Sequence, residues 1–503
     1  MEAQRFQEVK KRMSSTLQRL EEALGRDKVI SNPLALKHHI QGLSSFGPLD
    51  TNRPNFYPLA LVRAENTKDV QATVEVANLY HIPLTPRSSK SVPFHFGSHP
   101  CEDGILLDLS AMDRILSLDF KNRVAKIQPG VTWEKLTKEL ARHGMMIMNP
   151  LLPLPDRSVI TTLLDREPPL NPKFEMGEPL LSMELIWPTG EYFRTGSASS
   201  IGYPYNFADG VYPYGPGPID PLRLLQGAMG TMGIVTWANV KMEWRPQVNK
   251  TFLFYSSSLE QAVELVYAIQ RLRLGNECLI LNSTNFKLIF KTQPEKIWST
   301  LLVLGGPRWF PDEKIAYEKD ALLELLRNKF PSVQCNEVST LDETGYDLPH
   351  ILREPCHSTP YWKTALRGAW EDIFFITLLE KVPLFVDSVT EVCRKRGVDL
   401  ASFGVYVQPL EYGAGAHLEF QFFYNPYEDR KVQLINSMIP EIVENVLDLG
   451  AHFTRFNNEV VKRAVNQRVD PTYRDVAIRI KRIVDPNMIM NPDRFFIDGG
   501  GVC

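Results

Sequence analysis

The sequence predicts an α+β protein with more than one domain, and three observations lead to this class. Between residues 57 and 145, short apolar segments typical of strands alternate with segments of helical period. The chain has 503 residues, which exceeds the size of one ordinary hydrophobic core. The composition changes near Pro246, after which amphipathic helical segments alternate with short strands.

The chain begins with a predicted helical segment at residues 1–58. Residues 4–25 show the period of an amphipathic helix, and Gly25 is expected to end it. Residues 26–57 are rich in loop-forming residues, and "GPLDTNRPNFYP" reads as a linker. This segment is therefore expected to lie ahead of the first domain.

Residues 59–246 are predicted to form that first domain. "PLALVRA", "IPLTPR", "ILLDLS" and "RVAKIQPG" read as strands. The helix "TKDVQATVEVANLY" is expected to be capped by Thr67, and the helix "TWEKLTKELARHG" by Thr132, with Gly144 closing it. "LLSMELIWPTGEYFRTG" predicts a hairpin that turns at Thr189-Gly190.

Residues 247–449 are predicted to form a second α+β domain. "SLEQAVELVYAIQRLR", "PDEKIAYEKDALLELLRNKF" and "VPLFVDSVTEVCRKRG" have helical period and alternate with short strands. Residues 450–503 form a C-terminal segment, in which "VDPTYRDVAIRIKRIV" reads as a helix followed by a proline-containing loop.

Charge and cysteine content limit the class of function. The chain has 56 basic and 59 acidic residues and a net charge of −3, whereas a general nucleic-acid binder usually has a basic surplus. Its six cysteines are scattered without a CxxC pair, so neither a zinc site nor an iron–sulfur cluster is indicated. Free thiols in a reducing compartment are the simpler interpretation.

The N-terminus and the apolar runs bear on location. Residues 1–25 have mixed charge and lack the apolar core of a signal peptide. No apolar run reaches the length of a transmembrane helix. We therefore expect a cytoplasmic protein, with peripheral membrane contact left open.

One loop bears directly on function. "TPRSSKSVPFHFG", residues 85–97, stands between two predicted strands, where a loop that holds a pyrophosphate would follow the first strand. Such loops usually contain glycines, because backbone N–H groups must approach the anion closely. This chain has Ser88, Ser89, Lys90 and Ser91 instead.

Five segments, in order, resemble flavoproteins of the vanillyl-alcohol oxidase / p-cresol methylhydroxylase (PCMH) type. They are "LVRAENTKDVQATVEVANLYHIPLTPR", "ILLDLSAMDRIL", "AKIQPGVTWEKLTKELARHG", "GAMGTMGIVTWANVKM" and "RIVDPNMIMNPDRFF". The resemblance covers nearly the whole chain. It implies a PCMH-type FAD-binding domain of two α/β subdomains at 59–246, to which residues 450–503 return. It also implies an α+β cap domain with an antiparallel sheet at 247–449.

The resemblance implies which residues bind FAD, and we expect the FAD to be non-covalent. Serine hydroxyls and Lys90 would compensate for the missing glycines, while the alternative is a loop that binds FAD weakly or not at all. A second group, at residues 158–162, would bind the flavin or merely satisfy a turn. The expected cofactor-binding residues are Pro86, Arg87, Ser88, Ser89, Lys90, Ser91, Ser158, Val159, Thr161, Thr162, Gly230, Gly233, Ile234, Val235 and Arg494.

Strand alternation indicates candidate catalytic residues. In "HLEFQFF", His417, Glu419 and Gln421 share one face, which either lines a substrate cavity or is exposed to solvent. The resemblance favours the cavity and assigns Arg455, in "GAHFTRFNNE", a place beside the flavin, where it would stabilise developing negative charge.

Two further groups complete the candidates. His452 could act as a base or be structural. Glu175 and Glu178 would supply an acid near flavin N5 or be surface carboxylates.

Together these features predict an FAD-dependent oxidoreductase. It would take a hydride onto flavin N5 from a small aromatic or apolar alcohol or phenol-like substrate and pass electrons to oxygen or a carrier protein. The alternative is a non-redox descendant of the fold, a lyase, isomerase or binding protein with altered or lost FAD binding. No His-x-Gly-Asp-Gly or HExxH stretch occurs, so no catalytic metal is expected. A homodimer is expected from the resemblance.

Overall fold

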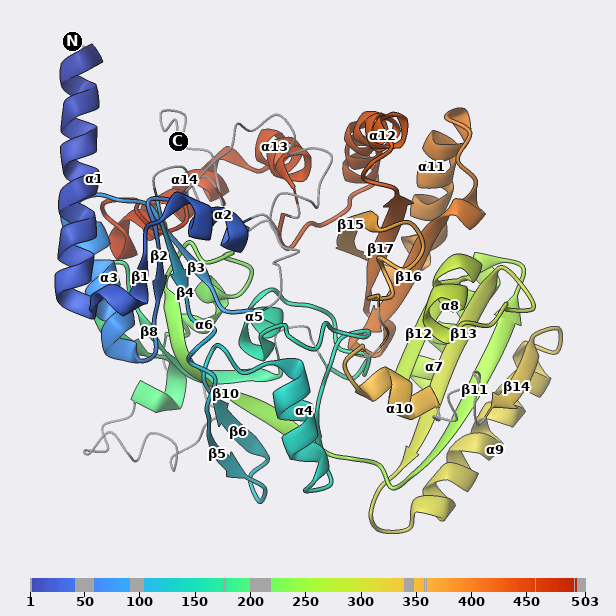
Figure 1. Ribbon diagram of the computed structural model, residues 1–503. Helices are drawn as coiled ribbons and strands as arrows, with labels where there is room; N and C mark the ends of the chain where they lie inside the picture. Colours follow the sequence, from blue (N-terminus) through green and yellow to red (C-terminus); the bar gives the residue numbers. More distant parts are fainter. Residues whose placement is uncertain are drawn as a thin grey trace.

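The computed structural model arranges the chain around three β-sheets (Figure 1). It describes residues 2–40, 58–90, 104–174, 178–199, 219–338, 348–356, 358, 360–456, 458–492 and 494, with the backbone alone at 2–10 and 37–40. The mixture of helices with parallel and antiparallel strands confirms the expected α+β class.

The first sheet belongs to the N-terminal part of the chain and is covered by α1 (Glu2–Leu24) and α3 (Thr67–Leu79). β2 and β3 pair with β4 in parallel, and β1 is antiparallel to β2. The strands, in sheet order, are β1 (Val29–Ile30), β2 (Ala60–Arg63), β4 (Ile105–Asp108) and β3 (Leu84–Arg87).

The expected cap of α3 is wrong. Asn66, not Thr67, accepts hydrogen bonds from the backbone of Lys68 and Asp69. The reason is conformational, since a capping residue needs an extended backbone and Asn66 has one, whereas Thr67 is already the first helical residue.

The second sheet is antiparallel and carries the expected hairpin. β8 pairs with β9 on either side of Gly190, whose φ of +92° suits a glycine in this turn. Thr132 caps α4 (Trp133–Ala141), as predicted, and α5 (Val159–Leu164) follows. The strands are β5 (Ile115–Asp119), β6 (Val124–Ile127), β7 (Met145–Ile147), β8 (Leu180–Ile186), β9 (Tyr192–Arg194) and β10 (Ile234–Trp244).

The third sheet is antiparallel and has the order β14-β11-β13-β12-β16-β17-β15. Its strands are β11 (Val248–Ser256), β12 (Glu277–Asn282), β13 (Trp298–Gly306), β14 (Gln334–Val338), β15 (Ala369–Thr377), β16 (Phe403–Leu410) and β17 (Gly415–Tyr424). β10 ends at Trp244 and β11 begins at Val248, on either side of Pro246. The predicted domain boundaries themselves stay a prediction.

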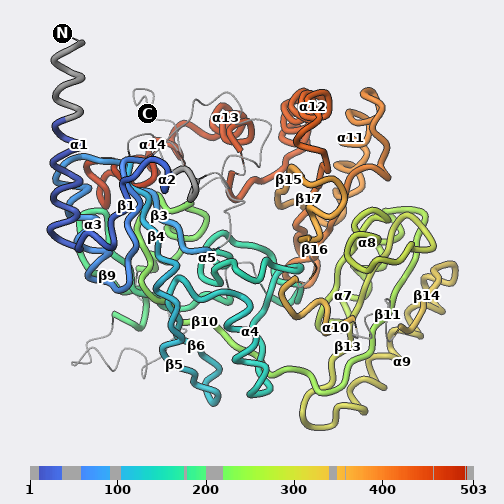
Figure 2. Tube along the Cα trace, in the orientation of Figure 1, coloured from blue at the N-terminus to red at the C-terminus, as the bar shows by residue number. Residues whose placement is uncertain are grey.

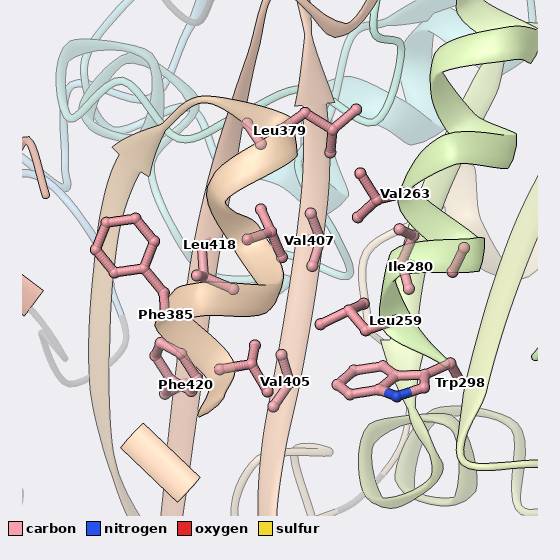
Figure 3. Packing of buried hydrophobic residues seen from close by; sticks show 14 of the residues in the cluster. Leu259, Val263, Ile280, Trp298, Leu379, Phe385, Val405, Val407, Leu418 and Phe420 are labelled. Atoms are coloured by element: carbon pink, nitrogen blue, oxygen red, sulfur yellow. The ribbon is translucent and has the colours of Figure 1, made fainter. Parts of the chain in front are cut away.

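Helices cover both faces of this sheet. Figure 3 shows Leu259 and Val263 of α7, with Phe385 of α11, packed against Val407 and Leu418 of the sheet. On the other face, apolar side chains of α8 and α10 pack against β11, β12 and β13. The helices are α7 (Leu259–Arg271), α8 (Ser283–Phe290), α9 (Pro311–Lys329), α10 (Leu348–Arg353), α11 (Val382–Lys395) and α12 (Asp429–Asp448).

The C-terminal helices lie in the same part of the view as the first sheet (Figure 2), and the residues that follow them return to β3. α13 (Glu459–Arg468) and α14 (Pro471–Val484) precede Met490, which forms a parallel bridge with Leu84 of β3. The Lys481 ammonium, buried beside Asp485, donates to the carbonyls of Thr231 at 2.6 Å and Met490 at 3.1 Å. These contacts fix the loop before β10 against the end of β3.

Within the described ranges, no helix combines the length and the apolar character needed to cross a bilayer.

Candidate functional site

Two neighbouring cavities lie between the second sheet and the β15–β17 edge of the third, and Phe374 and Arg455 line both. The first holds about 990 Å³ of space free of protein atoms and the second about 710 Å³, each partly open to solvent. Among the residues lining the first cavity are Pro86, Arg87, Ser88, Ser89, Thr161, Asp165, Gly230, Gly233, Ile234, Val235, Phe374 and Arg455.

The serine-rich loop forms one wall of the first cavity and is tied to the start of α5. The Ser88 hydroxyl shares a hydrogen bond with that of Thr161, and Ser89 Oγ accepts from the Ser158 backbone at 3.1 Å. Arg87 is held by Asp108, with Nη2 to Oδ2 at 2.8 Å. Hydroxyls and a fixed guanidinium are therefore aligned along this wall, and both can donate to phosphate oxygens.

The loop before β10 forms the apolar wall, and its glycines are required by close approach. Gly230 has a φ of +73°, and a Cβ built there would lie 2.8 Å from Pro86 Cγ. At Gly233 a Cβ would lie 2.8 Å from Leu185 Cδ1. Any larger residue would push this wall into the cavity or against its neighbours.

The structure brings nine of the expected cofactor residues to the first cavity: Pro86, Arg87, Ser88, Ser89, Thr161, Gly230, Gly233, Ile234 and Val235. It places five others elsewhere, and Ser91 falls outside the described residues. Lys90 pairs with Asp113 at 3.0 Å, and Arg494 lies 3.6 Å from Glu459. Val159 packs in the core beneath the second sheet.

The remaining two expected cofactor residues, Ser158 and Thr162, form hydrogen bonds within the protein. Ser158 caps α5 and donates to the Pro129 carbonyl, and Thr162 Oγ1 accepts from Trp133 Nε1 at 2.9 Å. These bonds match the alternative in which the hydroxyls satisfy a turn.

A buried ring of four charges stands at the junction of the two cavities. Arg157 pairs with Asp165 at 3.0 Å and also with Glu167, while Arg455 pairs with Asp165 at 3.2 Å and Glu167 at 3.4 Å. The four side chains are 8–13% exposed. Two cations and two anions alternate, so the ring carries no net charge when all four are ionised.

Asp165 is the carboxylate of this ring that lines the first cavity. Burial raises its pKa above the ordinary value, although Arg455 and Arg157 act in the opposite direction. Arg455 lies against the ring of Phe374, with the guanidinium carbon 4.6 Å from the ring centroid, and its buried Nε has no hydrogen-bond partner. The ring thus contains a carboxyl that can exchange a proton and a guanidinium with a spare donor.

The second cavity has aromatic walls and a charged floor. Tyr361, Trp362, Trp370, Phe374 and Tyr406 line it. Lys363 lies between two carboxylates, donating to Asp372 Oδ2 at 2.8 Å and pairing also with Glu419.

The pKa values of these charged groups diverge. Burial raises the pKa of Asp372 to about 7 against the opposing effect of Lys363. Burial acts the same way on Glu419, but Lys363 and His417 outweigh it and lower its pKa.

The polar row on β17 faces this second cavity. His417 and Glu419 line it, and they hydrogen-bond at 3.1 Å, while Gln421 donates to Glu419 at 2.7 Å. Leu418 and Phe420 point to the opposite side, into the core seen in Figure 3. His417 also stacks on Phe374, with ring centroids 5.7 Å apart.

Other expected catalytic residues are placed differently. The His452 side chain is exposed and lines neither cavity, while its backbone bridges to Ile376. Glu178 pairs with Lys241 at 3.1 Å at the surface, and Glu175 lies outside the described residues.

The sequence reasoning missed Asp165, Glu167, Lys363 and Asp372. Alternation in "WEDIFF" would have placed Asp372 and Phe374 on one face of a strand, but no local pattern joins them to Lys363. Among the described residues, no group of three or more His, Cys, Asp and Glu side chains could hold a metal ion.

The first cavity suits a dinucleotide. Its hydroxyl wall offers donors to phosphates, its glycine wall leaves room for a flat ring, and the spare Arg455 donor sits at the end shared with the second cavity. A profile of the family described as FAD binding domain matches residues 58–196. The chain contains an FAD-binding domain, and the expected FAD cofactor is confirmed.

Relatives extend the likeness over almost nine tenths of the chain. The chain is 21% identical to the glycolate oxidase subunit GlcD of Bacillus subtilis, covering 87% of this chain and 89% of the relative. It is 23% identical to the 4-cresol dehydrogenase [hydroxylating] flavoprotein subunit of Pseudomonas putida, covering 88% of each. These relatives support an oxidoreductase, with substrate unassigned.

The fold itself is that of a solved flavoprotein. The structure of p-cresol methylhydroxylase with substrate bound matches at a TM-score of 0.82, with 18% identity over 98% of both chains. The expected PCMH-type fold, with its FAD-binding domain and antiparallel cap sheet, is therefore confirmed.

Proposed function

We propose that the protein is an FAD-dependent oxidoreductase that oxidises a small aromatic or apolar alcohol or phenol-like substrate in the second cavity. The observation that carries this proposal is the shared boundary of the two cavities, where Phe374 and Arg455 line both. A substrate in one cavity and a cofactor in the other would meet at this boundary. FAD, when bound, accepts a hydride at N5 of its ring.

The residues of the chain would then have distinct tasks. Ser88, Ser89 and Thr161 would hold the cofactor phosphates, and Arg455 would stabilise negative charge that develops at the boundary. Asp165, whose pKa is raised by burial, would exchange a proton there. The aromatic walls of the second cavity would orient a flat substrate and exclude water.

Two features support a phenol-like substrate. The aromatic side chains match a benzene ring, and the polar floor at Lys363 offers a partner for its hydroxyl. The relative from Pseudomonas putida and the solved structure are both named for cresol, which is a phenol. The non-redox alternative finds no support among these relatives, which are named as oxidase and dehydrogenase.

We further propose that FAD is held without a covalent bond. Covalent attachment in this type of flavoprotein uses a histidine or tyrosine, and neither occurs among the described residues that line the first cavity. The cytoplasmic location, the homodimer and the electron acceptor, oxygen or a carrier protein, stay predictions.

Anaerobic titration tests the proposed function. The FAD-loaded protein is mixed with 4-alkylphenols, benzylic alcohols and 2-hydroxy acids while the flavin absorbance is followed. We expect bleaching by phenols or benzylic alcohols. Bleaching by 2-hydroxy acids alone would contradict the substrate class, and a bound flavin that no compound reduces would contradict the oxidoreductase.

A further inference from the structure

Helix α14 turns an apolar stripe toward solvent and a lysine toward the interior. The stripe has the three- and four-residue spacing of one helix side and consists of Tyr473, Val476, Ile480 and Ile483. Tyr473 is 60% exposed, Val476 39% and Ile483 77%. Of the 14 residues of α14, all of which the structure describes, only Lys481 is buried. A surface helix in water normally buries its apolar side, so α14 has the reverse arrangement.

Polar contacts with the rest of the chain hold α14 in this orientation. The Lys481 ammonium, buried beside Asp485, donates to two backbone carbonyls. Just after the helix, the Asn487 amide donates a hydrogen bond to Asn78, at the end of α3. The residue after Asn78 is Leu79, which is 65% exposed. The end of the stripe is therefore followed by a second exposed apolar position.

Basic side chains accompany the stripe. The sequence of α14 has four basic residues and one acidic residue, a surplus of three positive charges (4 − 1) on a chain whose net charge is −3. Arg479 is exposed and lies beside the stripe, because it is three residues after Val476 and four before Ile483. The acidic residue, Asp475, pairs with Arg474 at 3.8 Å. An apolar stripe bordered by arginines is typical of helices that lie in a membrane interface.

Another exposed apolar surface of the chain has the opposite charge. At the start of α9, Trp309 and Phe310 are each 73% exposed, and Tyr317 is 75% exposed. The first turn of α9 contains Asp312 and Glu313, which anionic lipid headgroups would repel. Apolar area alone therefore does not identify the occupant of α14. Its arginines point to a surface that is both apolar and negatively charged.

We propose that α14 docks the protein on the surface of an anionic phospholipid bilayer. The stripe enters the boundary between headgroups and acyl chains, and Arg479 and Arg482 contact the lipid phosphates. The helix has 14 residues, fewer than the roughly 20 that span the hydrocarbon core, so it lies along the surface. This docking goes beyond the proposed function and does not depend on it.

Sedimentation of the FAD-loaded protein with lipid vesicles tests this docking. One set of vesicles is made of phosphatidylcholine, and the other also contains phosphatidylglycerol. We expect binding to the anionic set that weakens with added salt, because ions screen exposed charges. Ile483→Asp should weaken this binding at least about tenfold, since an apolar side chain is lost and a negative charge is added. Arg479→Gln should weaken it about fivefold.

Two matched controls come from the start of α9, which lies across the molecule from α14 (Figure 1). Phe310→Asp makes a similar change at a side chain that is 73% exposed, against 77% for Ile483, and its φ of +53° suits aspartate. Arg308→Gln removes another exposed arginine. Both variants should bind the anionic vesicles like the wild type. An equal loss of binding in Phe310→Asp and Ile483→Asp overturns the proposal.

Other occupants of the stripe would give different results. If a second copy of the chain covered it, the protein without vesicles would sediment as a dimer that Ile483→Asp converts to a monomer, and the proposal would be overturned. Equal binding to neutral and anionic vesicles, or binding to neither, overturns it as well.

Hydrogen exchange on the unmodified protein covers the case in which Ile483→Asp does not fold. Anionic vesicles should slow amide exchange in residues 471–484, because docking shields α14, and should leave residues 311–329 of α9 unchanged. Exchange in α14 that is the same with and without anionic vesicles overturns the proposal.

Discussion

Replacement of Arg455 by glutamine tests the charged ring that joins the two cavities. Arg455 is the partner of both Asp165, at 3.2 Å, and Glu167, at 3.4 Å, and its side chain is 8% exposed. Without it, two buried carboxylates share the single guanidinium of Arg157. Loss of one partner from a buried pair typically lowers the free energy of unfolding by about 3–5 kcal/mol, so we expect a decrease of that size in Arg455→Gln at pH 8.

The surface of the protein offers a matched control. Arg468 also bridges two carboxylates, Glu444 at 2.5 Å and Asp448 at 2.6 Å, but its side chain is 38% exposed. If contact distance decided the effect, Arg468→Gln would be the more damaging change, because its contacts are shorter. Since solvent screens the exposed charges, we expect Arg468→Gln to be the milder one.

Equilibrium urea unfolding, followed by tryptophan fluorescence and by release of FAD, measures both variants. The direction in which the stability defect of Arg455→Gln changes with pH follows from Asp165. Because the pKa of Asp165 is raised, this carboxyl takes up a proton earlier than an ordinary aspartate as the pH falls. Below that pKa one of the two stranded carboxylates is neutral, so the defect of Arg455→Gln should shrink. A defect no larger than that of Arg468→Gln, or one that does not change with pH, would refute the reasoning.

Two further predictions concern the walls of the first cavity. Ser88→Ala combined with Ser89→Ala should raise the dissociation constant of FAD by about 5- to 150-fold, since each of the two lost hydrogen bonds is worth about 0.5–1.5 kcal/mol. Ser199→Ala, which lies outside the cavity lining, should leave the dissociation constant unchanged in fluorescence titration. Gly230→Ala should weaken FAD binding and lower the melting temperature, because the methyl group meets a proline ring at 2.8 Å; Gly144→Ala, which shares a positive φ but has open space around it, should leave FAD binding intact.

The elements fixed by local signals could be predicted from the sequence. Thr132, the hairpin turn at Gly190 and the polar row of His417 and Glu419 each depend on a few neighbouring residues, and the structure has all three as expected. α12, which the sequence analysis did not identify, contains Pro440 in its interior, where a proline removes a backbone donor and argues against a helix.

The parts of the site that could not be predicted from the sequence depend on tertiary contacts. Asp165 follows a six-residue helix and pairs with Arg455, which lies nearly 300 residues later in the sequence. Lys363 precedes β15 and reaches Glu419 on a strand more than fifty residues later. Lys90 was expected at the phosphates from its position in the loop, but Asp113 holds its ammonium outside the cavity lining. In each case, a residue that is distant in the sequence decides where the side chain lies.

The most direct measurement is a crystal structure of the protein grown with excess FAD. The account predicts electron density for FAD in the first cavity, with the phosphates against Ser88, Ser89 and Thr161 and the flavin ring reaching the boundary formed by Phe374 and Arg455. Density for solvent alone in that cavity, with FAD present in excess, would contradict it.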